Sequence, residues 1–303
     1  MAKPTLLYGV GATKAGTSWL YRLLDDHPEC HVRAVKEAHY WNSETPEQRQ
    51  RRVEVLTRQL QGLEHDRQAA VARGNGQKAA NLDRRIAAIA GLIDVMRGDV
   101  ADHRAYVNWL SAGCGKAQRL IGDVTPAYGL LSTERLREML AVWKGPVRVV
   151  YLIRDPLERL WSHVRMDAER RMQAGDDFAA KAHGIFDRLL ARTGEMQIWR
   201  RGDYRAAIRK LTEAVPAGGL LIGFTEQMFS GEGRARIYDF LGITAGADDV
   251  AEDRLVHPSR GLDLDDARAE RAVNMLKVQY NWVAENVGTL PAVWQANLAR
   301  ASA

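Results

Sequence analysis

Cysteine is nearly absent from this 303-residue chain: only Cys30 and Cys114 occur, and neither belongs to a Cys-x-x-Cys pair. Two such cysteines provide neither a disulfide framework nor a structural zinc site, and they are typical of a reducing cytoplasm. Long hydrophobic runs are also missing, so no segment is predicted to span a membrane. The N-terminal residues MAKPTLLYGVG lack the apolar stretch of a signal peptide, and we predict a cytoplasmic protein.

Strong charge of one sign is missing too, since 43 Lys and Arg face 38 Asp and Glu and leave a net charge of +5. This excess suits an anionic ligand. Basic stretches such as RQRR are interleaved with acids, as on a solvated helix face, and we predict no nucleic-acid partner. The chain shows no internal repeat and no low-complexity linker, which favours a single domain over residues 1–303.

What the chain does contain is a repeated order of apolar strand, loop and helix. Thr5–Val10 is predicted to be a buried strand that leads through a glycine loop into a helix over Thr17–Asp26. Val147–Ile153 is a β-branched run typical of a central parallel strand. A third strand, Gly219–Phe224, follows a helix predicted over Tyr204–Val215. This alternation predicts an α/β fold with a central parallel sheet flanked by helices.

Residues 44–97 differ from the rest of the chain because they are rich in Gln, Arg, Glu and Ala, with apolar residues at helical intervals. We predict a hairpin of two antiparallel helices that meet at Gly74–Gly76 and form an insertion in the α/β domain. The insertion serves packing or oligomerisation, or it covers the active site. Residues 263–300 are predicted to be mostly helical.

The loop after the first strand, GATKAGTS over residues 11–18, offers unpaired amides, two hydroxyls and one ammonium group to an oxyanion. A nucleotide-hydrolysing P-loop has its lysine directly after the last glycine. Here Thr17 occupies that position and Lys14 lies three residues earlier. The loop therefore predicts phosphate binding of a different type.

A second phosphate site is predicted where the strand Val147–Ile153 ends. Arg154 follows the strand, and Ser162 lies two helical turns after Asp155. Asp155 and Pro156 suit the N-cap and the first position of a helix, so Asp155 is better used as a cap than as a magnesium ligand. Neutralisation of the ligand by lysine and arginine, without a metal, is the arrangement that this favours.

Together these two motifs resemble the sulfotransferase family, whose donor is 3′-phosphoadenosine 5′-phosphosulfate (PAPS). TKAGTSWLYRLL is similar to the family's 5′-phosphosulfate loop, and YLIRDPLERLWSHVRM is similar to its 3′-phosphate motif. The resemblance implies that Arg154 and Ser162 bind the 3′-phosphate. It implies that Lys14 binds the oxygen bridging phosphate and sulfuryl group, where charge develops as the bond breaks. The implied donor-binding residues in the loop are Lys14, Ala15, Gly16, Thr17, Ser18 and Trp19, with Trp19 either under the adenine or packed on the sheet.

KEAHYWN, residues 36–42, resembles the segment of carbohydrate sulfotransferases, including the heparan-sulfate type, that carries a catalytic glutamate. The resemblance implies Glu37 as the general base, and His39 is the alternative base or a residue that orients the acceptor. GDVTPAY, residues 122–128, resembles the acceptor-side segment, which implies Thr125 and Tyr128 as acceptor contacts. Val124 replaces a lysine that is common there, and Lys36 is a candidate substitute.

HPSRGLD, residues 257–263, occupies the place of a family loop that closes over the nucleotide, which implies Arg260 and Gly261 as further donor contacts. We thus expect a bacterial sulfotransferase that needs no metal. Two alternatives stay open. One is a P-loop kinase or nucleoside triphosphatase with a degenerate loop, and the other is an interaction protein that forms homo-oligomers through the insertion at residues 44–97.

Overall fold

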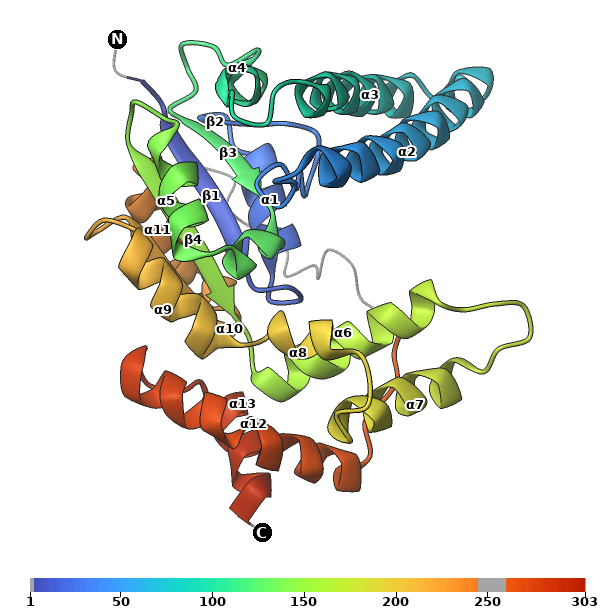
Figure 1. Cartoon of the computed structure of the whole chain (residues 1–303), viewed down its shortest axis with the longest axis vertical. Coiled ribbons are helices and arrows are strands. Elements are labelled where there is room, and N and C mark those ends of the chain that lie inside the picture. The colour runs from blue at the N-terminus through green and yellow to red at the C-terminus, as the bar shows by residue number, and fades with distance from the viewer. Residues whose placement is uncertain (1–2, 245–259, 303) are drawn as a thin grey trace.

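The computed structural model describes residues 3–244 and 260–302. Five parallel strands form one sheet in the order β2-β3-β1-β4-β5 (Figure 1). The strands are β1 (Thr5–Gly11), β2 (Cys30–Val32), β3 (Leu120–Val124), β4 (Val147–Ile153) and β5 (Leu220–Phe224). β3 is buried along its whole length and β4 over its last five residues, as expected of parallel strands covered on both faces. The predicted α/β fold is confirmed.

Helices follow the strands and cover the sheet. They are α1 (Thr17–Asp25), α2 (Pro46–Ala72), α3 (Gly76–Arg97), α4 (Arg104–Ser111), α5 (Thr133–Ala141), α6 (Pro156–Arg170), α7 (Phe178–Leu190), α8 (Met196–Arg200), α9 (Tyr204–Ala214), α10 (Thr225–Met228), α11 (Gly231–Leu241), α12 (Asp266–Asn286) and α13 (Ala292–Ala299), with 3₁₀ turns η1 (Pro126–Leu130) and η2 (Arg300–Ser302). None of the described helices is long and apolar enough to cross a membrane.

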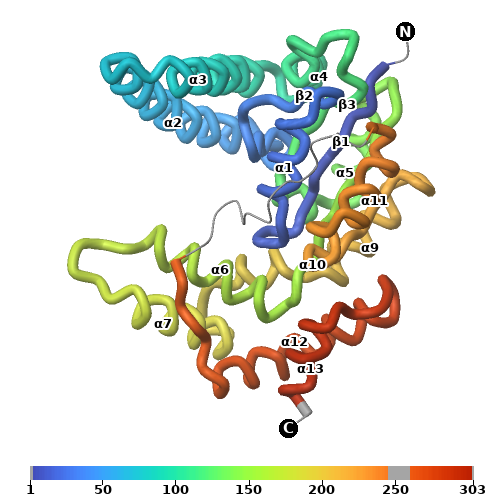
Figure 2. Tube along the Cα trace, turned by 180° about the vertical axis from the view of Figure 1, so that it is seen from behind, coloured from blue at the N-terminus to red at the C-terminus, as the bar shows by residue number. Residues whose placement is uncertain are grey.

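The segment 44–97 contains α2 and α3, which lie side by side and extend away from the sheet, at the opposite end of the molecule from α12 and α13 (Figures 1 and 2). Thr45 and Gln48 form a capping box that starts α2, and the Asn75 side chain caps α3. Leu56 and Leu92 belong to the buried core. The apolar faces of the two helices are therefore buried within the chain itself. A role of the hairpin in oligomerisation stays a prediction.

Because all five strands are parallel, their carboxyl ends lie at one edge of the sheet, where ligands of open α/β sheets bind. The glycine loop leaves β1 there, residues 36–42 follow β2 after a short connection, and Arg154 follows β4. Three stretches of sequence thus meet at one place, although the first and the last are more than a hundred residues apart in the chain.

Candidate active site

A cavity of about 620 Å³ lies at this edge of the sheet. It is lined by residues from the glycine loop, from the segment after β2, from α6 and from α8. Of the predicted site residues, the cavity brings together Lys14, Gly16, Thr17, Ser18, Trp19, Lys36, Glu37, His39, Arg154 and Ser162.

Gly16 shapes the phosphate loop. It is the N-cap of α1 with a φ of 86°, a conformation that favours glycine, and a Cβ there would lie 3.1 Å from Thr225 Cγ2. The single Thr225 hydroxyl proton is shared between the carbonyls of Ala15 and Ile153, at 2.8 and 3.0 Å, and this connects the loop to the end of β4. No side chain caps α1. Its first amides therefore stay available to an anion, whose charge the helix dipole also favours.

Lys14 lies at the turn of this loop with a left-handed φ of 68°. Burial lowers the pKa of its ammonium group, and the positive charges of Arg154, Arg165 and Arg170 lower it further. No ion pair to Lys14 occurs within residues 3–244 and 260–302. A lysine crowded by other cations and lacking a carboxylate is well placed to bind a multiply charged anion.

The end of β4 supplies a second cationic group. Arg154 Nη2 lies 3.2 Å from Glu158 Oε2, one turn along α6, and Ser162 lines the same cavity one turn further on. Arg154 is thus held near the cavity by a partly exposed partner. The arginine and the serine are one set of candidate anion ligands, and the α1 amides are another.

Asp155 is a helix cap, as the sequence predicts. Its Oδ1 accepts from the Glu158 amide at 2.9 Å and from Asn297 at 3.0 Å, and its Oδ2 accepts from the Tyr280 hydroxyl at 2.8 Å. Burial raises the pKa of Asp155 to about 6. Because the carboxylate is completely buried and both oxygens are engaged, it is not a ligand that faces the cavity.

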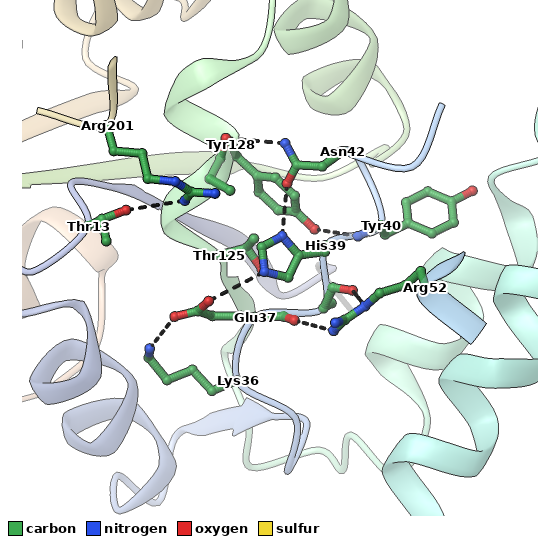
Figure 3. A network of polar contacts seen from close by, with 12 residues as sticks. Thr13, Lys36, Glu37, His39, Tyr40, Asn42, Arg52, Thr125, Tyr128 and Arg201 are labelled. Carbon is green, nitrogen blue, oxygen red and sulfur yellow. Dashed lines mark hydrogen bonds and ion pairs between the residues drawn. The ribbon is translucent and has the colours of Figure 1, made fainter. Parts of the chain in front are cut away.

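Glu37 lines the cavity and forms the centre of a polar network (Figure 3). Lys36 Nζ donates to its Oε1 at 2.7 Å, and His39 Nε2 lies 3.4 Å from its Oε2. Burial by itself raises the pKa of Glu37, but the His39 hydrogen bond and the charge of Lys36 outweigh it and hold that pKa well below its ordinary value. Glu37 is therefore a carboxylate throughout the physiological pH range.

The orientation of His39 follows from Asn42. The amide nitrogen of Asn42 donates to the Ala127 carbonyl at 3.2 Å, so its Oδ1 faces His39 Nδ1 at 3.3 Å. Nδ1 is then the donor to Asn42, and Nε2 is the ring nitrogen that faces the Glu37 carboxylate. Glu37 and His39 are thus in direct contact, and the choice between them as the base stays open.

The predicted acceptor contacts Thr125 and Tyr128 do not line the cavity. Both are completely buried, and both hydroxyls donate to the Asp123 carboxylate, at 2.7 and 2.8 Å, together with the Tyr106 hydroxyl at 2.8 Å. The Tyr128 hydroxyl also accepts from the Tyr40 amide at 3.1 Å. Tyr128 thus connects Asp123 to the segment that carries Glu37, and the three donors compensate for the burial of the Asp123 carboxylate.

Three other predicted donor contacts also lie off the cavity lining. Ala15 belongs to the loop but is completely buried and does not line the cavity. The guanidinium of Arg260 lies 4.7 Å from the Phe178 ring centroid, and neither Arg260 nor Gly261 lines the cavity. The preceding residues of that motif, 257–259, lie outside the described residues.

The cavity also contains residues that the sequence analysis missed. Phe229 lies after β5 with its ring centroid 4.9 Å from that of Trp19, so that two aromatic side chains line the cavity beside the loop. Arg201, just after α8, reaches across to Thr13, with 3.5 Å between its Nη1 and the threonine Oγ1 (Figure 3). Placement after the last strand was a signal for Phe229. The sequence holds no signal for Arg201, because its partner Thr13 is 188 residues away in the chain.

Residues 7–247 match the sulfotransferase family. The chain belongs to this family. Among solved structures, a sulfotransferase from Alicyclobacillus acidocaldarius is similar, with a TM-score of 0.56 and 14% identity over 97% of this chain and 100% of that one. A sulfotransferase domain from the curacin biosynthetic pathway matches at a TM-score of 0.42 and 13% identity, over 82% of this chain and 76% of that one.

At these identities, the similarity to the Alicyclobacillus structure shows the fold alone. The TM-score of the curacin domain is too low to support any argument. No curated protein matches the sequence. The family membership establishes this protein as a sulfotransferase, in agreement with the expectation from its two phosphate motifs. The roles of the individual cavity residues stay predictions.

Proposed function

We propose that this sulfotransferase transfers a sulfuryl group from PAPS to a hydroxyl or amine of a carbohydrate or small metabolite, in the bacterial cytoplasm and without a metal. The observation that carries the donor assignment is that Lys14, the start of α1, Arg154 and Ser162 all line one cavity. The α1 amides with Lys14 suit a 5′-phosphosulfate, and Arg154 with Ser162 suits a 3′-phosphate.

The aromatic pair supports a nucleotide donor. Trp19 and Phe229 line the cavity beside the α1 amides, where the 5′-phosphate would bind. A purine has an apolar face that stacks on aromatic rings, and such stacking contributes about 1–3 kcal/mol. The adenine is therefore assigned to this pair. Of the two roles that the sequence leaves open for Trp19, the cavity favours adenine binding.

In the proposed reaction, the acceptor oxygen attacks sulfur in line with the bond to the bridging oxygen of the donor. The new S–O bond forms as the old one breaks, and adenosine 3′,5′-bisphosphate (PAP) leaves with the electron pair. Lys14 stabilises the charge that develops on the bridging oxygen, and this interaction is stronger in the transition state than in the ground state. Lys36 and Arg201 are further cations that line the cavity, and we assign them to the transferred group.

The acceptor's proton goes to the pair formed by Glu37 and His39. These residues line the same cavity as the loop, next to Lys36. The low pKa of Glu37 makes it a weak base while Lys36 and His39 both bind it. We propose Glu37 as the base, with His39 Nε2 as the neighbouring donor that orients its carboxylate.

Isothermal titration calorimetry with PAP, compared with ATP and 5′-AMP, tests the donor assignment. We expect micromolar PAP binding that depends on the 3′-phosphate and is unchanged when magnesium is removed. A preference for magnesium-ATP would overturn the proposal in favour of a kinase-like reaction.

A further inference from the structure

The backbone that carries the proposed base has an unfavourable conformation. Glu37 has a φ of 65° and His39 a φ of 56°, both in the left-handed region that residues with a Cβ rarely adopt. Such residues persist only where surrounding contacts hold them, and they gather at functional sites. The contacts that hold residues 37–39 therefore determine where the two side chains point.

One of these contacts comes from the helical hairpin. Arg52, in the second turn of α2, donates from Nη2 to the Glu37 carbonyl at 2.6 Å and from Nε to the Ala38 carbonyl at 3.1 Å (Figure 3). The planar guanidinium thus binds two successive carbonyls, a geometry that a lysine cannot reproduce.

Arg52 has no carboxylate within ion-pair distance in the described parts of the chain. It is partly buried, and burial lowers the pKa of its guanidinium. A desolvated arginine usually acquires a carboxylate partner. Here its hydrogen bonds go to the strained backbone of the proposed base, which lies 15 residues away in the sequence.

The hairpin is itself fixed at its base, so it can hold this backbone in place. Arg49, one turn before Arg52, donates to the carbonyls of Ser43, Gly98 and Asp99 at distances of 3.1–3.3 Å. These contacts join the first turn of α2 to the segments that enter and leave the hairpin. The hairpin therefore provides a rigid support for the Arg52 side chain.

We infer that Arg52 is a positioning residue for the Glu37–His39 pair, and that the hairpin is thereby a part of the active site. Arg52 holds the carbonyls of residues 37 and 38, and so directs the Glu37 carboxylate toward the cavity and toward His39 Nε2. The catalytic role of Arg52 rests on the proposed function. The contact between Arg52 and the two carbonyls does not depend on that function.

The test compares Arg52→Ala and Arg52→Lys with Arg58→Ala, a control that removes an exposed arginine from the same helix. Hydrogen exchange of residues 36–42 reports whether the backbone is held. PAP calorimetry and thermal unfolding report the donor site and the fold. Release of PAP from PAPS, with water and with phenol as probe acceptors, reports turnover, with and without added guanidinium ion at a non-denaturing concentration.

We expect Arg52→Ala to exchange the amides of residues 37–40 at least tenfold faster and to lower turnover at least tenfold. PAP affinity should change less than threefold, guanidinium should restore part of the turnover, and Arg52→Lys should be intermediate. Arg58→Ala should resemble the wild type in each measurement.

Unchanged exchange in Arg52→Ala would overturn the inference, and so would faster exchange with unchanged turnover. A loss of turnover matched by an equal loss of PAP affinity and thermal stability would also overturn it, because Arg52 would then serve only the general fold. Failure of the wild type to bind PAP would instead refute the proposed function, and the exchange measurement would still decide whether Arg52 holds this backbone.

Discussion

Replacing Arg154 with alanine should weaken PAP binding but leave 5′-AMP binding nearly unchanged, because only PAP carries the 3′-phosphate assigned to this arginine. A hydrogen bond to a charged group contributes about 1.5–3 kcal/mol, which corresponds to a loss of roughly tenfold to a hundredfold in affinity. Arg154 is not fully available in the free protein, since Glu158 lies 3.2 Å away. The phosphate must share the guanidinium with Glu158 or displace it.

This competition makes the opposite prediction for Glu158. The Arg154–Glu158 pair is partly exposed, and such pairs contribute only about 0.2–1 kcal/mol. Glu158→Gln should therefore tighten PAP binding by up to about fivefold, and it should have no effect in an Arg154→Ala background.

Calorimetry of the two single variants and the double variant measures the affinity of each for PAP and for 5′-AMP. Equal losses for the two nucleotides in Arg154→Ala would show that the arginine supports the cavity in general. Unchanged affinity for both would refute the 3′-phosphate assignment.

Three other perturbations follow from the site. Lys14→Ala should lower turnover by about 10²–10³-fold while changing the Kd of PAP much less, and parallel losses in both would contradict a role at the bridging oxygen. Lys36→Met removes a charge that keeps the pKa of Glu37 low, so the acidic limb of the pH–rate profile should move to higher pH; an unmoved limb would exclude Glu37 as the titrating base. The pKa of Asp155 is raised to about 6, above its value of about 3.9 in an unfolded chain, so its contribution to stability is full below pH 4 and is lost as the pH rises to 6. Urea unfolding of Asp155→Asn at pH 4 and pH 7 should show the variant gaining up to about 3 kcal/mol relative to the wild type, and a gain toward low pH would reverse this assignment.

The sequence predicted the elements whose signals are local. The strand Val147–Ile153 has the predicted bounds, and Asp155 caps the next helix because an aspartate followed by proline needs no distant partner to do so. The two phosphate motifs also lie at strand-to-helix junctions, as the sequence predicts, and their binding of phosphate stays a prediction.

What the sequence did not reveal depends on contacts between distant segments. Thr125 and Tyr128 belong to a motif that resembles an acceptor site, yet their hydroxyls donate to the buried Asp123, and only the folded chain shows which way they point. In the sequence, Arg52 looks like any other charged residue on a solvated helix. Its two carbonyl partners lie outside that helix, so the helical pattern does not indicate them. The type of each element could thus be predicted from the sequence, whereas the burial and the direction of these side chains could not.

The two ends of the helical hairpin differ in a way that an engineer could use. At the tip, the turn at Gly74 has a φ of 67°, and no atom outside its own neighbours lies within 4 Å of where its Cβ would be. An added label or small domain at that turn would meet no packed side chain there, and exposed loop tips of this kind tolerate insertions. At the base, Arg49 and Arg52 connect the hairpin to the segment of the proposed base. A reporter grafted at the tip would therefore be joined to the chemistry by two stiff helices.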